Sequence, residues 1–183
     1  MQIIGVGYKK NRGKDTLCNF IKDCLHRTHP LLKVKKVGFA DKLKDIAYQV
    51  YGWAGLQPGV YYESHYRAKE EVLPELGLTP RDIWIGIGNG LREIYNPTWI
   101  HYLTKTQLRA DVILIKDMGF TNEAKEIRES GGLLLQVCRD GPMSTDAREV
   151  ELDTWTDWDC LFGNRGTLHD LNLLAEDFCK EYF

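Results

Sequence analysis

A glycine- and lysine-rich stretch near the N-terminus combines residue types and a spacing that bind phosphate. It runs from residue 7 to residue 16 and reads GYKKNRGKDT. The backbone N–H groups of a tight glycine loop, together with the positive end of the following helix, hold polyphosphate, and a lysine at the helix start adds a mobile cation. The stretch therefore predicts a phosphate-binding loop centred on Gly13 and Lys14.

The match to the usual loop pattern is imperfect. That pattern places four residues between the first glycine and a Gly-Lys-[Ser/Thr] sequence, whereas five residues separate Gly7 from Gly13, and Asp15 stands where a hydroxyl is expected. The surroundings favour the loop, because a strand-like apolar run at 2–6 precedes it and apolar residues at helical spacing follow from Leu17. The alternative is a lysine-rich surface turn with an accidental Gly-Lys pair.

The rest of the chain alternates strand-like and helix-like segments. Apolar runs typical of strands occupy 33–40, 112–115, 133–138 and 158–162. Amphipathic segments typical of helices begin at Asp41, Thr121 and Thr167. This alternation predicts an α/β protein with three layers, α/β/α, around a five-stranded, mostly parallel sheet.

We expect one domain covering residues 1–183, with two interruptions. Between 51 and 79 the helical periodicity fails and turn residues accumulate, which indicates a substrate-binding insertion at about 52–110. A solvated excursion with aromatic anchors is the alternative for this region. The polar, irregular stretch at about 140–156 predicts a flap.

A helix is expected from Thr79 onward. Thr79 is a typical N-cap, Pro80 fits the first helical position, and Asp82 completes a capping box, so Arg81 lies in the first turn. Three glycines at 86, 88 and 90 are unfavourable inside a helix and suggest that something approaches the backbone closely. The alternatives are a helix broken near Gly88 or a short strand at 84–87.

Charged residues follow two of the strand-like runs. Lys116 and Asp117 come at the carboxyl end of the run at 112–115, and Arg139 follows the run at 133–138. Ligands of doubly wound sheets bind at these ends. A carboxylate there holds Mg²⁺ or orients a nucleophilic oxygen, and a turn or helix-cap aspartate is the plain alternative for Asp117.

Composition narrows the class of partner. The chain has 26 acidic and 24 basic residues and a net charge of −2, so no overall basic field favours a nucleic acid or an anionic membrane. No apolar stretch approaches the length of a membrane span. Five cysteines without a C-x-x-C pair predict reduced core thiols in a cytoplasmic protein. The expected partners are small molecules, and a homodimer stays open.

Phosphoryl transfer is the function that these features favour most. It needs a lysine on the donor phosphates, a magnesium ion, and guanidinium groups on donor and acceptor. Lys14, Arg81, Asp117 and Arg139 are therefore the candidate catalytic residues, and the candidate Mg²⁺ ligands are Asp15, Thr16 and Asp117. The cations expected to surround a second phosphate are Lys44, Arg67, Lys69, Arg81 and Arg92.

Several motifs, taken in order, resemble those of bacteriophage deoxynucleoside monophosphate kinases. They are GKDT at 13–16, FADKLK at 39–44, TPR at 79–81 with GN at 88–89, Trp99, DMGFTNE at 117–123, the segment from Gly131 to Arg139, and NRGTL at 164–168. Together they span nearly the whole chain. The resemblance implies a P-loop kinase fold, ATP as donor, Mg²⁺, and a 2′-deoxynucleoside 5′-monophosphate as acceptor, in the host cytoplasm for a phage protein.

The resemblance also implies roles for individual residues. Those on the donor side are Lys9 or Lys10, Gly13, Lys14, Asp15, Thr16, Arg139 and Asn164. Those on the acceptor side are Leu43, Lys44, Arg81, Gly88, Asn89, Trp99, Asp117 and Glu123. Apart from the resemblance, the aromatic residues Phe39, Trp84 and Trp99 are candidates for stacking on the base, with a place in the core as the alternative for each. Arg139 and the flap would close on the transferred group.

The sequence departs from this family in three places. The loop is one residue longer, so either Lys9 or Lys10 could reach phosphate. Gly119 stands where the family has an arginine after Met118, and Lys116 and Arg128 are the two candidates to compensate for it. The flap reads DARE at 146–149, and only the glutamate of the family's pattern survives.

Two other functions compete with this interpretation. Another small-molecule P-loop kinase, for dephospho-coenzyme A or phosphomevalonate, would have much the same donor half. A P-loop nucleotide-binding regulator that hydrolyses or senses ATP would need no second phosphate site.

Overall fold

The computed structural model describes residues 1–9, 11–105, 109–141 and 150–183. Their contacts divide the chain into two compact units. The first unit comprises Met1–Gly38 and Ile100–Phe183, and the second comprises Phe39–Trp99. None of the helices in the described ranges is both long and apolar enough to cross a membrane.

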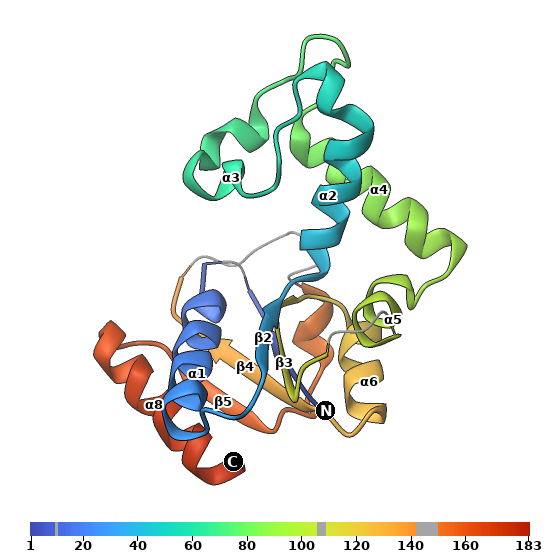
Figure 1. Cartoon of the computed structure of the whole chain (residues 1–183). Coiled ribbons are helices and arrows are strands. Elements are labelled where there is room, and N and C mark those ends of the chain that lie inside the picture. The colour runs from blue at the N-terminus through green and yellow to red at the C-terminus, as the bar shows by residue number, and fades with distance from the viewer. Residues whose placement is uncertain (10, 106–108, 142–149) are drawn as a thin grey trace. The chain divides into compact units, whose positions relative to one another are not determined.

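The first unit contains a five-stranded sheet whose strands are all parallel. The strands are β1 (Gln2–Gly7), β2 (Val34–Val37), β3 (Val112–Met118), β4 (Leu133–Cys138) and β5 (Cys160–Gly163). They lie in the order β2-β3-β1-β4-β5 (Figure 1). The central position of β1 places the loop that follows it at the middle of the sheet's carboxyl edge, where ligands of such sheets bind.

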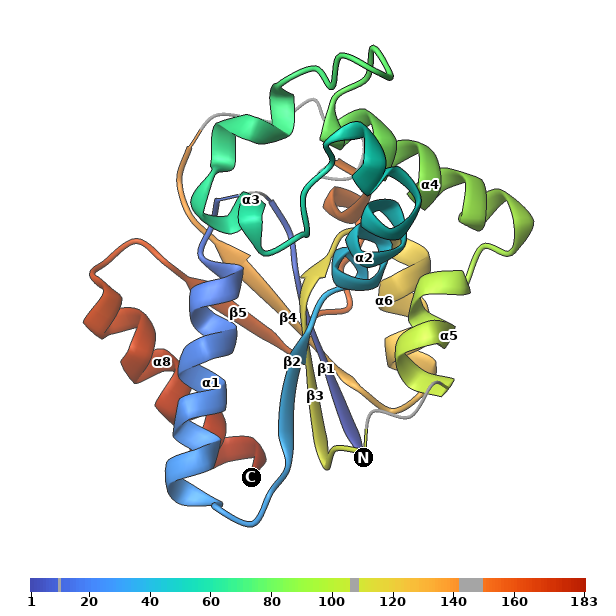
Figure 2. The ribbon, with the colours of Figure 1, turned by 45° about the horizontal axis from the view of Figure 1, so that its top comes forward.

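Helices cover both faces of this sheet, as Figure 2 shows. On one face, α1 (Lys14–Thr28) and α8 (Leu168–Tyr182) pack against each other and against the strands. On the other face lie α6 (Thr121–Glu129) and, from Ile100 onward, α5 (Thr98–Lys105). The three-layer α/β/α architecture with a five-stranded sheet is therefore confirmed, and the sheet is entirely parallel.

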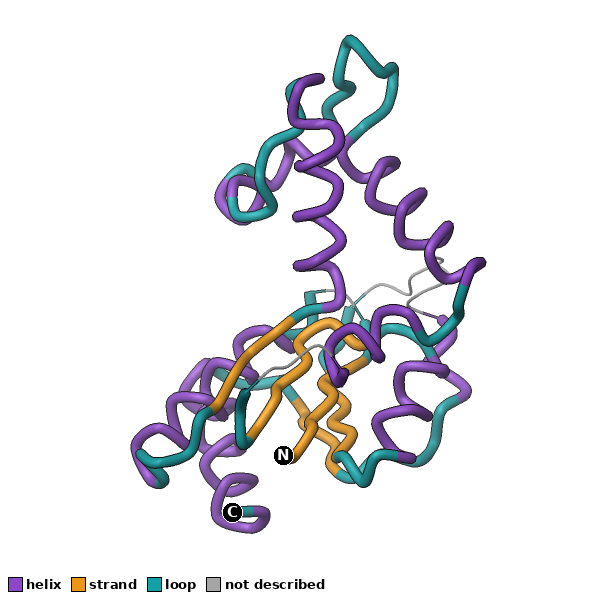
Figure 3. Tube along the Cα trace, turned by 45° about the vertical axis from the view of Figure 1, so that its right-hand side comes forward, coloured by secondary structure: helices purple, strands orange, loops and turns teal. Residues whose placement is uncertain are grey.

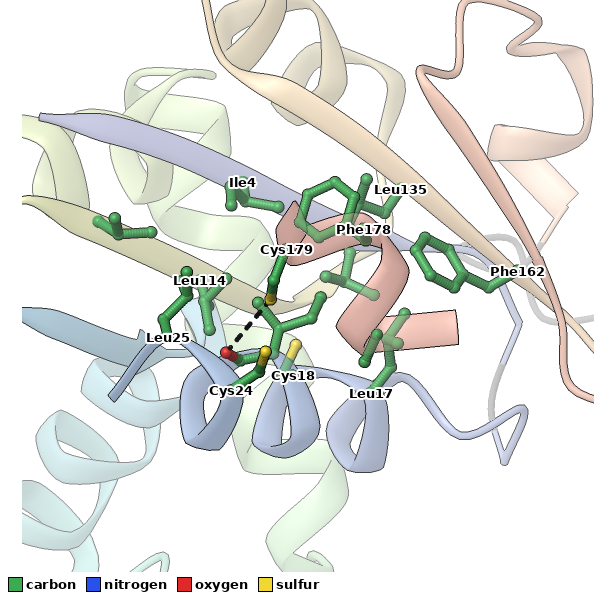
Figure 4. Close-up of a cluster of buried hydrophobic side chains, with 14 of the residues drawn as sticks. Ile4, Leu17, Cys18, Cys24, Leu25, Leu114, Leu135, Phe162, Phe178 and Cys179 are labelled. Carbon is green, nitrogen blue, oxygen red and sulfur yellow. Dashed lines mark hydrogen bonds between the residues drawn. The ribbon is translucent and has the colours of Figure 1, made fainter. Parts of the chain in front are cut away.

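The core between the sheet and the pair α1 and α8 is apolar and contains three cysteines (Figure 4). Ile4 and Leu114 from the strands pack against Leu17 and Leu25 of α1. Burial raises the pKa of the Cys18 thiol to about 12, with the nearby carboxylates of Asp15 and Asp117 adding to the effect. All five cysteines are free: Cys18, Cys24 and Cys179 are buried, and Cys138 and Cys160 are half-buried.

Two strand boundaries differ from the sequence predictions. β2 ends at Val37, and the next helix begins at Phe39 rather than Asp41. β3 does not stop at Ile115, because it pairs with β1 as far as Met118. Gly5 pairs with Ile115 and Gly7 with Met118, so β3 carries one extra residue there, and such bulges redirect side chains. Lys116 and Asp117 thus lie within the strand.

The second unit consists of helices joined by loops (Figure 3). Its helices are α2 (Phe39–Tyr51), η1 (Gly52–Ala54), α3 (Tyr61–Ser64), η2 (Tyr66–Glu70) and α4 (Pro80–Ile94). Ala47, Leu56, Tyr62 and Ile83 form its core, so the irregular stretch before Thr79 packs onto α2 and α4. The stretch is therefore anchored by apolar contacts of its own.

Helix α4 forms as predicted. Thr79 Oγ1 accepts from the Asp82 backbone N–H at 3.1 Å, while Asp82 Oδ2 accepts from the Thr79 N–H at 3.0 Å. The helix continues through its three glycines to Ile94, which excludes a strand at 84–87 and a break at Gly88.

Candidate active site

Three of the described residues in the loop between β1 and α1 have left-handed backbone angles. Tyr8 has φ of 91°, Asn11 of 59° and Gly13 of 97°. Glycine is required at 13 because the amide nitrogen of Asn164 occupies the place that a side chain would take. The packing of Asn164 against the loop therefore depends on a glycine at position 13.

Asn164 supports the loop from beneath. Its side chain is buried, its Nδ2 donates to the Arg12 carbonyl at 2.8 Å, and its backbone N–H donates to the Cys138 carbonyl at 2.7 Å. The sequence analysis assigned Asn164 to the donor site. The structure places it at that site as a support of the loop backbone.

Helix α1 begins without a side-chain cap from any described residue. Gly13 is its N-cap, and the first bond of the helix runs from the Leu17 N–H to the Gly13 carbonyl at 2.9 Å. The N–H groups of a first helical turn have no acceptor within the helix, and the helix dipole makes this end positive. The start of α1 therefore has the backbone arrangement of an anion site.

Lys14 lies across this loop. Its ammonium group donates to the carbonyl oxygens of Tyr8 at 2.9 Å and of Lys9 at 2.5 Å. The cation thus bridges the start of α1 and the chain that leaves β1. A phosphate placed at the loop would meet this charge directly.

Lys9 binds a carboxylate from a distant part of the chain. Its ammonium group lies 3.0 Å from Asp153 in η3 (Glu151–Thr154), and its side chain is only 11% exposed. The hydrogen bond to Asp153 raises the pKa of Lys9. Burial, and then the charge of Asp153, raises the pKa of Tyr8. Lys10, the other lysine proposed for phosphate, lies outside the described residues.

The three candidate metal ligands lie on α1 and β3. Asp15 and Thr16 are in the first turn of α1, and Asp15 pairs with Lys36 at 2.8 Å. Asp117, near the end of β3, lies so close to Gly38 that a Cβ there would come within 2.9 Å of its carboxylate. Charges from both Asp15 and Asp117 act on Cys18, so the two carboxylates flank the same part of α1.

Glu123 and Arg128, two residues with predicted roles at the site, make contacts within the first unit. Glu123 is buried, and its carboxylate accepts from the backbone N–H groups of Gly119 at 2.9 Å and Phe120 at 3.2 Å, which closes the start of α6. Arg128 pairs with Asp157 and Asp159 at 2.8 and 3.0 Å. Arg128 therefore ties α6 to the segment before β5, and the suggestion that it replaces the missing arginine is not supported.

The residues expected to close the site are described only in part. Arg139 follows β4 and is exposed. Most of the expected flap, residues 142–149, lies outside the described residues. Arg12 was not among the sequence candidates, although it lies inside the loop motif; it is 9% exposed, and its guanidinium group packs against Gly141.

In the second unit, cationic residues gather around the first turn of α4. Arg81 pairs with Glu70 of η2 at 2.8 Å, and the Lys44 ammonium group lies 5.3 Å from the centre of the Trp84 ring. Lys69 of η2 lies over Tyr66, with 4.3 Å between its ammonium group and the ring centre. Arg67 also belongs to η2 and is exposed.

Arg92 does not belong to this group. It lies eleven positions after Arg81 on α4, which at about 1.5 Å per residue is roughly 16 Å along the helix. Its guanidinium group is instead near Gly88, 3.6 Å from where a Cβ of that glycine would be.

Four of the predicted acceptor residues are buried, and three of them contact one another within the second unit. Phe39 and Trp99 are each 3% exposed, so neither presents a face for a base to stack on. The Trp99 indole N–H donates to the Gly88 carbonyl at 3.3 Å, and Leu43 lies where a side chain at Gly88 would be. The close approach expected at this glycine is therefore made by the chain itself. Asn89 beside it is exposed.

Comparisons with known proteins address the fold. No family model and no curated protein sequence matches the chain. The crystal structure of TT1252 from Thermus thermophilus is similar with a TM-score of 0.51 at 15% identity, covering 100% of this chain and 98% of that one. A shikimate kinase from Aquifex aeolicus gives a TM-score of 0.43 at 13% identity, covering 100% of both chains. The likeness to the Thermus protein concerns the fold alone, and the second score is too low to carry an argument. The three-layer α/β fold with a parallel five-stranded sheet, expected from the sequence, is thus shared with a known structure.

Proposed function

We propose that the protein is an ATP-dependent kinase that phosphorylates 2′-deoxynucleoside 5′-monophosphates to diphosphates. The observation that carries the proposal is the start of α1, where a glycine N-cap, uncapped helix amides and the Lys14 ammonium group lie together. Phosphoryl transfer depends mainly on positioning and on charge stabilisation, and this arrangement offers both to a polyphosphate.

Other helix starts support the assignment by contrast. At α4 and α8, a threonine and an aspartate satisfy the first-turn amides. At α6, Glu123 accepts from two amides and Glu151 accepts from the Thr121 N–H at 2.9 Å. The protein closes these three starts with its own oxygen atoms. The start of α1 is the one among the four that suits an external anion.

Mg²⁺ fits the oxygen atoms available near this loop. The hydroxyl of Thr16 and the carboxylates of Asp15 and Asp117 are ligands that Mg²⁺ accepts, and this ion usually completes its shell with water and substrate phosphate. No cluster of three or more His, Cys, Asp or Glu side chains suited to a metal occurs among the described residues, so a nucleotide-bound ion needing few protein ligands is the better fit. When bound, the ion neutralises charge on the donor phosphates.

Lys14 would stabilise the negative charge on the donor phosphates during transfer. In the structure its ammonium group binds the Tyr8 and Lys9 carbonyls, and it would exchange these for phosphate oxygens of ATP. The acceptor is already an anionic phosphate near pH 7, since the second pKa of a phosphate monoester is about 6. It needs orientation and no general base, which suits a site rich in cations.

The cations around the first turn of α4 would hold the acceptor. Lys44, Arg81 and the η2 residues gather there, and guanidinium groups bind phosphate with two parallel hydrogen bonds. A nucleotide sensor would need no such second group. Arg81 would exchange Glu70 for the acceptor's phosphate.

Release of ADP tests the proposal. The purified chain is incubated with ATP, Mg²⁺ and each of a panel of ribo- and deoxynucleoside monophosphates, with dephospho-coenzyme A and phosphomevalonate in parallel and with no acceptor as control. We expect ADP release that depends on a deoxynucleoside monophosphate. Turnover only with one of the other two acceptors would move the protein to another kinase class, and release without any acceptor would favour the ATP-hydrolysing regulator.

A further inference from the structure

The short helix η3 fixes three separate parts of the first unit with three consecutive side chains. Glu151 accepts from the Thr121 N–H at 2.9 Å and from its hydroxyl at 2.6 Å. Leu152 is 1% exposed and packs at Gly7, where a Cβ would lie 3.3 Å from it. Asp153 pairs with Lys9 at 3.0 Å. The end of β1 and the phosphate loop are therefore tied to a segment about 144 positions further along the chain.

The residue that pairs with Asp153 follows directly after a residue with a strained backbone. Tyr8 has a φ of 91°, a left-handed angle that a bulky residue rarely adopts unless its surroundings hold it there. Lys9 follows it, with its ammonium group 5.0 Å from the centre of the Tyr8 ring. The carbonyl groups of these same two residues accept from Lys14. The position of the Lys14 charge thus depends on where Tyr8 and Lys9 are held.

We propose that Asp153 is a positioning residue of the phosphate loop, and that Lys9 is the loop's anchor rather than a ligand of the donor phosphates. The proposal rests on the kinase function argued above. The Lys9 side chain is only 11% exposed, and its ammonium group is paired with a carboxylate. The pair has no net charge and presents few accessible N–H donors, so it would attract a phosphate only weakly. The loop is one residue longer than the usual pattern, and the Lys9–Asp153 pair fastens this longer stretch to η3.

The competing assignment makes an opposite prediction. If Lys9 were a phosphate ligand that Asp153 merely restrains, removing the Asp153 charge would release the ammonium group and strengthen nucleotide binding. If Asp153 positions the loop, the same change leaves Tyr8 and Lys9 without their support and weakens binding. The sign of the effect therefore separates the two roles.

Isothermal titration of ATP into the full chain measures this sign. The variants are Asp153→Asn, Lys9→Met and the double variant, with Asp157→Asn as a matched control, since Asp157 precedes β5 and pairs with Arg128 rather than with the loop. We expect Asp153→Asn and Lys9→Met each to weaken ATP binding about tenfold, and the double variant to be no weaker than either. The acceptor's KM should stay unchanged, which a general loss of structure would not allow.

The outcomes separate this inference from the proposed function. Failure of the wild-type chain to bind ATP would overturn both. Normal binding by the wild type, with unchanged or tighter binding by Asp153→Asn, would overturn the positioning role alone, and so would additive losses in the double variant. Should Asp153→Asn fail to fold, Lys9→Met carries the test: a loss of ATP affinity equal to that of Lys14→Ala in the same titration would identify Lys9 as a ligand and overturn its role as an anchor, and a smaller loss would support that role.

Discussion

Helices α1 and α8 pack side by side and are each 15 residues long, yet they begin in opposite ways. At the start of α8, Thr167 Oγ1 accepts from the Asp170 N–H at 3.2 Å, and Asp170 Oδ2 accepts from the Thr167 N–H at 2.7 Å. At the start of α1, a left-handed glycine precedes a lysine that reaches back over the loop. Side chains thus accept from two backbone amides at the start of α8, whereas no described side chain caps the start of α1.

The difference separates residues that stabilise the fold from residues that serve binding. An N-cap threonine and its partner contribute directly to helix stability. A glycine N-cap contributes little of this kind, but it lets the backbone approach an anion closely. Substitutions at the two starts should therefore change different measured quantities.

The largest effect is expected at α1. Lys14→Ala removes the cation proposed to bind the donor phosphates and should lower the rate of phosphoryl transfer roughly 10²–10³-fold, the loss typical for one preorganised electrostatic group. The thermal midpoint should change little, because the hydrogen bonds from Lys14 to the Tyr8 and Lys9 carbonyls can be replaced by hydrogen bonds to water. Lys180→Ala on α8, where Lys180 pairs with Asp177, is the matched control. Retained transfer would place the donor site elsewhere.

A second variant tests whether Arg81, at the capped start of α4, binds the acceptor's phosphate. The amides at the start of α4 are closed by Thr79 and Asp82, so a phosphate there would depend on Arg81. Arg81→Ala should raise the KM of the acceptor or lower its kcat/KM about tenfold, the scale of one charge-assisted hydrogen bond. The KM of ATP should stay the same. Both constants should also stay the same in the control Lys125→Ala, because Lys125 is an exposed residue of α6 that pairs with Glu129. An effect confined to ATP would move Arg81 to the donor side.

The start of α8 should respond in stability alone. Thr167→Ala removes the cap and should lower the free energy of unfolding by about 1 kcal/mol, which for a chain of this size is a fall in Tm of about 2–4 °C. Urea unfolding measures the first quantity and calorimetry the second. A change in the KM of ATP would show that the two helix starts are not independent and would break the comparison.

The smallest effect concerns pH. The backbone N–H and then the hydroxyl of Thr167 donate to the ionised Asp170 carboxylate and hold its pKa below the ordinary value. Because the pKa is lower in the folded state, the contribution to stability is complete above the unfolded pKa of about 4 and is lost as the pH falls below it. Asp170→Asn should therefore be less stable than the wild type at pH 7, and the difference should narrow near pH 3. If the difference in stability between the wild type and Asp170→Asn did not change with pH, it would arise from packing rather than from the charge of Asp170.

Local patterns predicted much of this molecule. The order of strand, loop and helix around Gly13 and the capping box at Thr79 both depend on residues close together in sequence, and both formed as expected. The parallel sheet followed from the alternation of short apolar runs with amphipathic segments.

Contacts between distant residues could not be read in the same way. Asp153 lies in a polar stretch with no signal that distinguishes it from a solvated aspartate, so its pairing with Lys9 was missed. β3 extends to Met118 because Met118 pairs with Gly7 of β1. This pairing is not visible in the sequence, where the polar residues Lys116 and Asp117 end the apolar run. For Phe39 and Trp99, an aromatic side chain that packs and one that stacks on a base look alike in sequence, and burial decided between them.

The hydrogen bonds from Lys14 to the Tyr8 and Lys9 carbonyls lower the affinity of the loop for any anion that must replace them. An incoming anion competes with the Tyr8 and Lys9 carbonyls, which already satisfy part of the ammonium group, so the observed affinity measures an exchange rather than a simple gain. A single phosphate offers few oxygens to offset that loss, whereas a polyphosphate contacts the lysine and the helix amides together. Under the proposed function, the loop would therefore favour a polyphosphate over a single phosphate, whatever base the nucleotide carries.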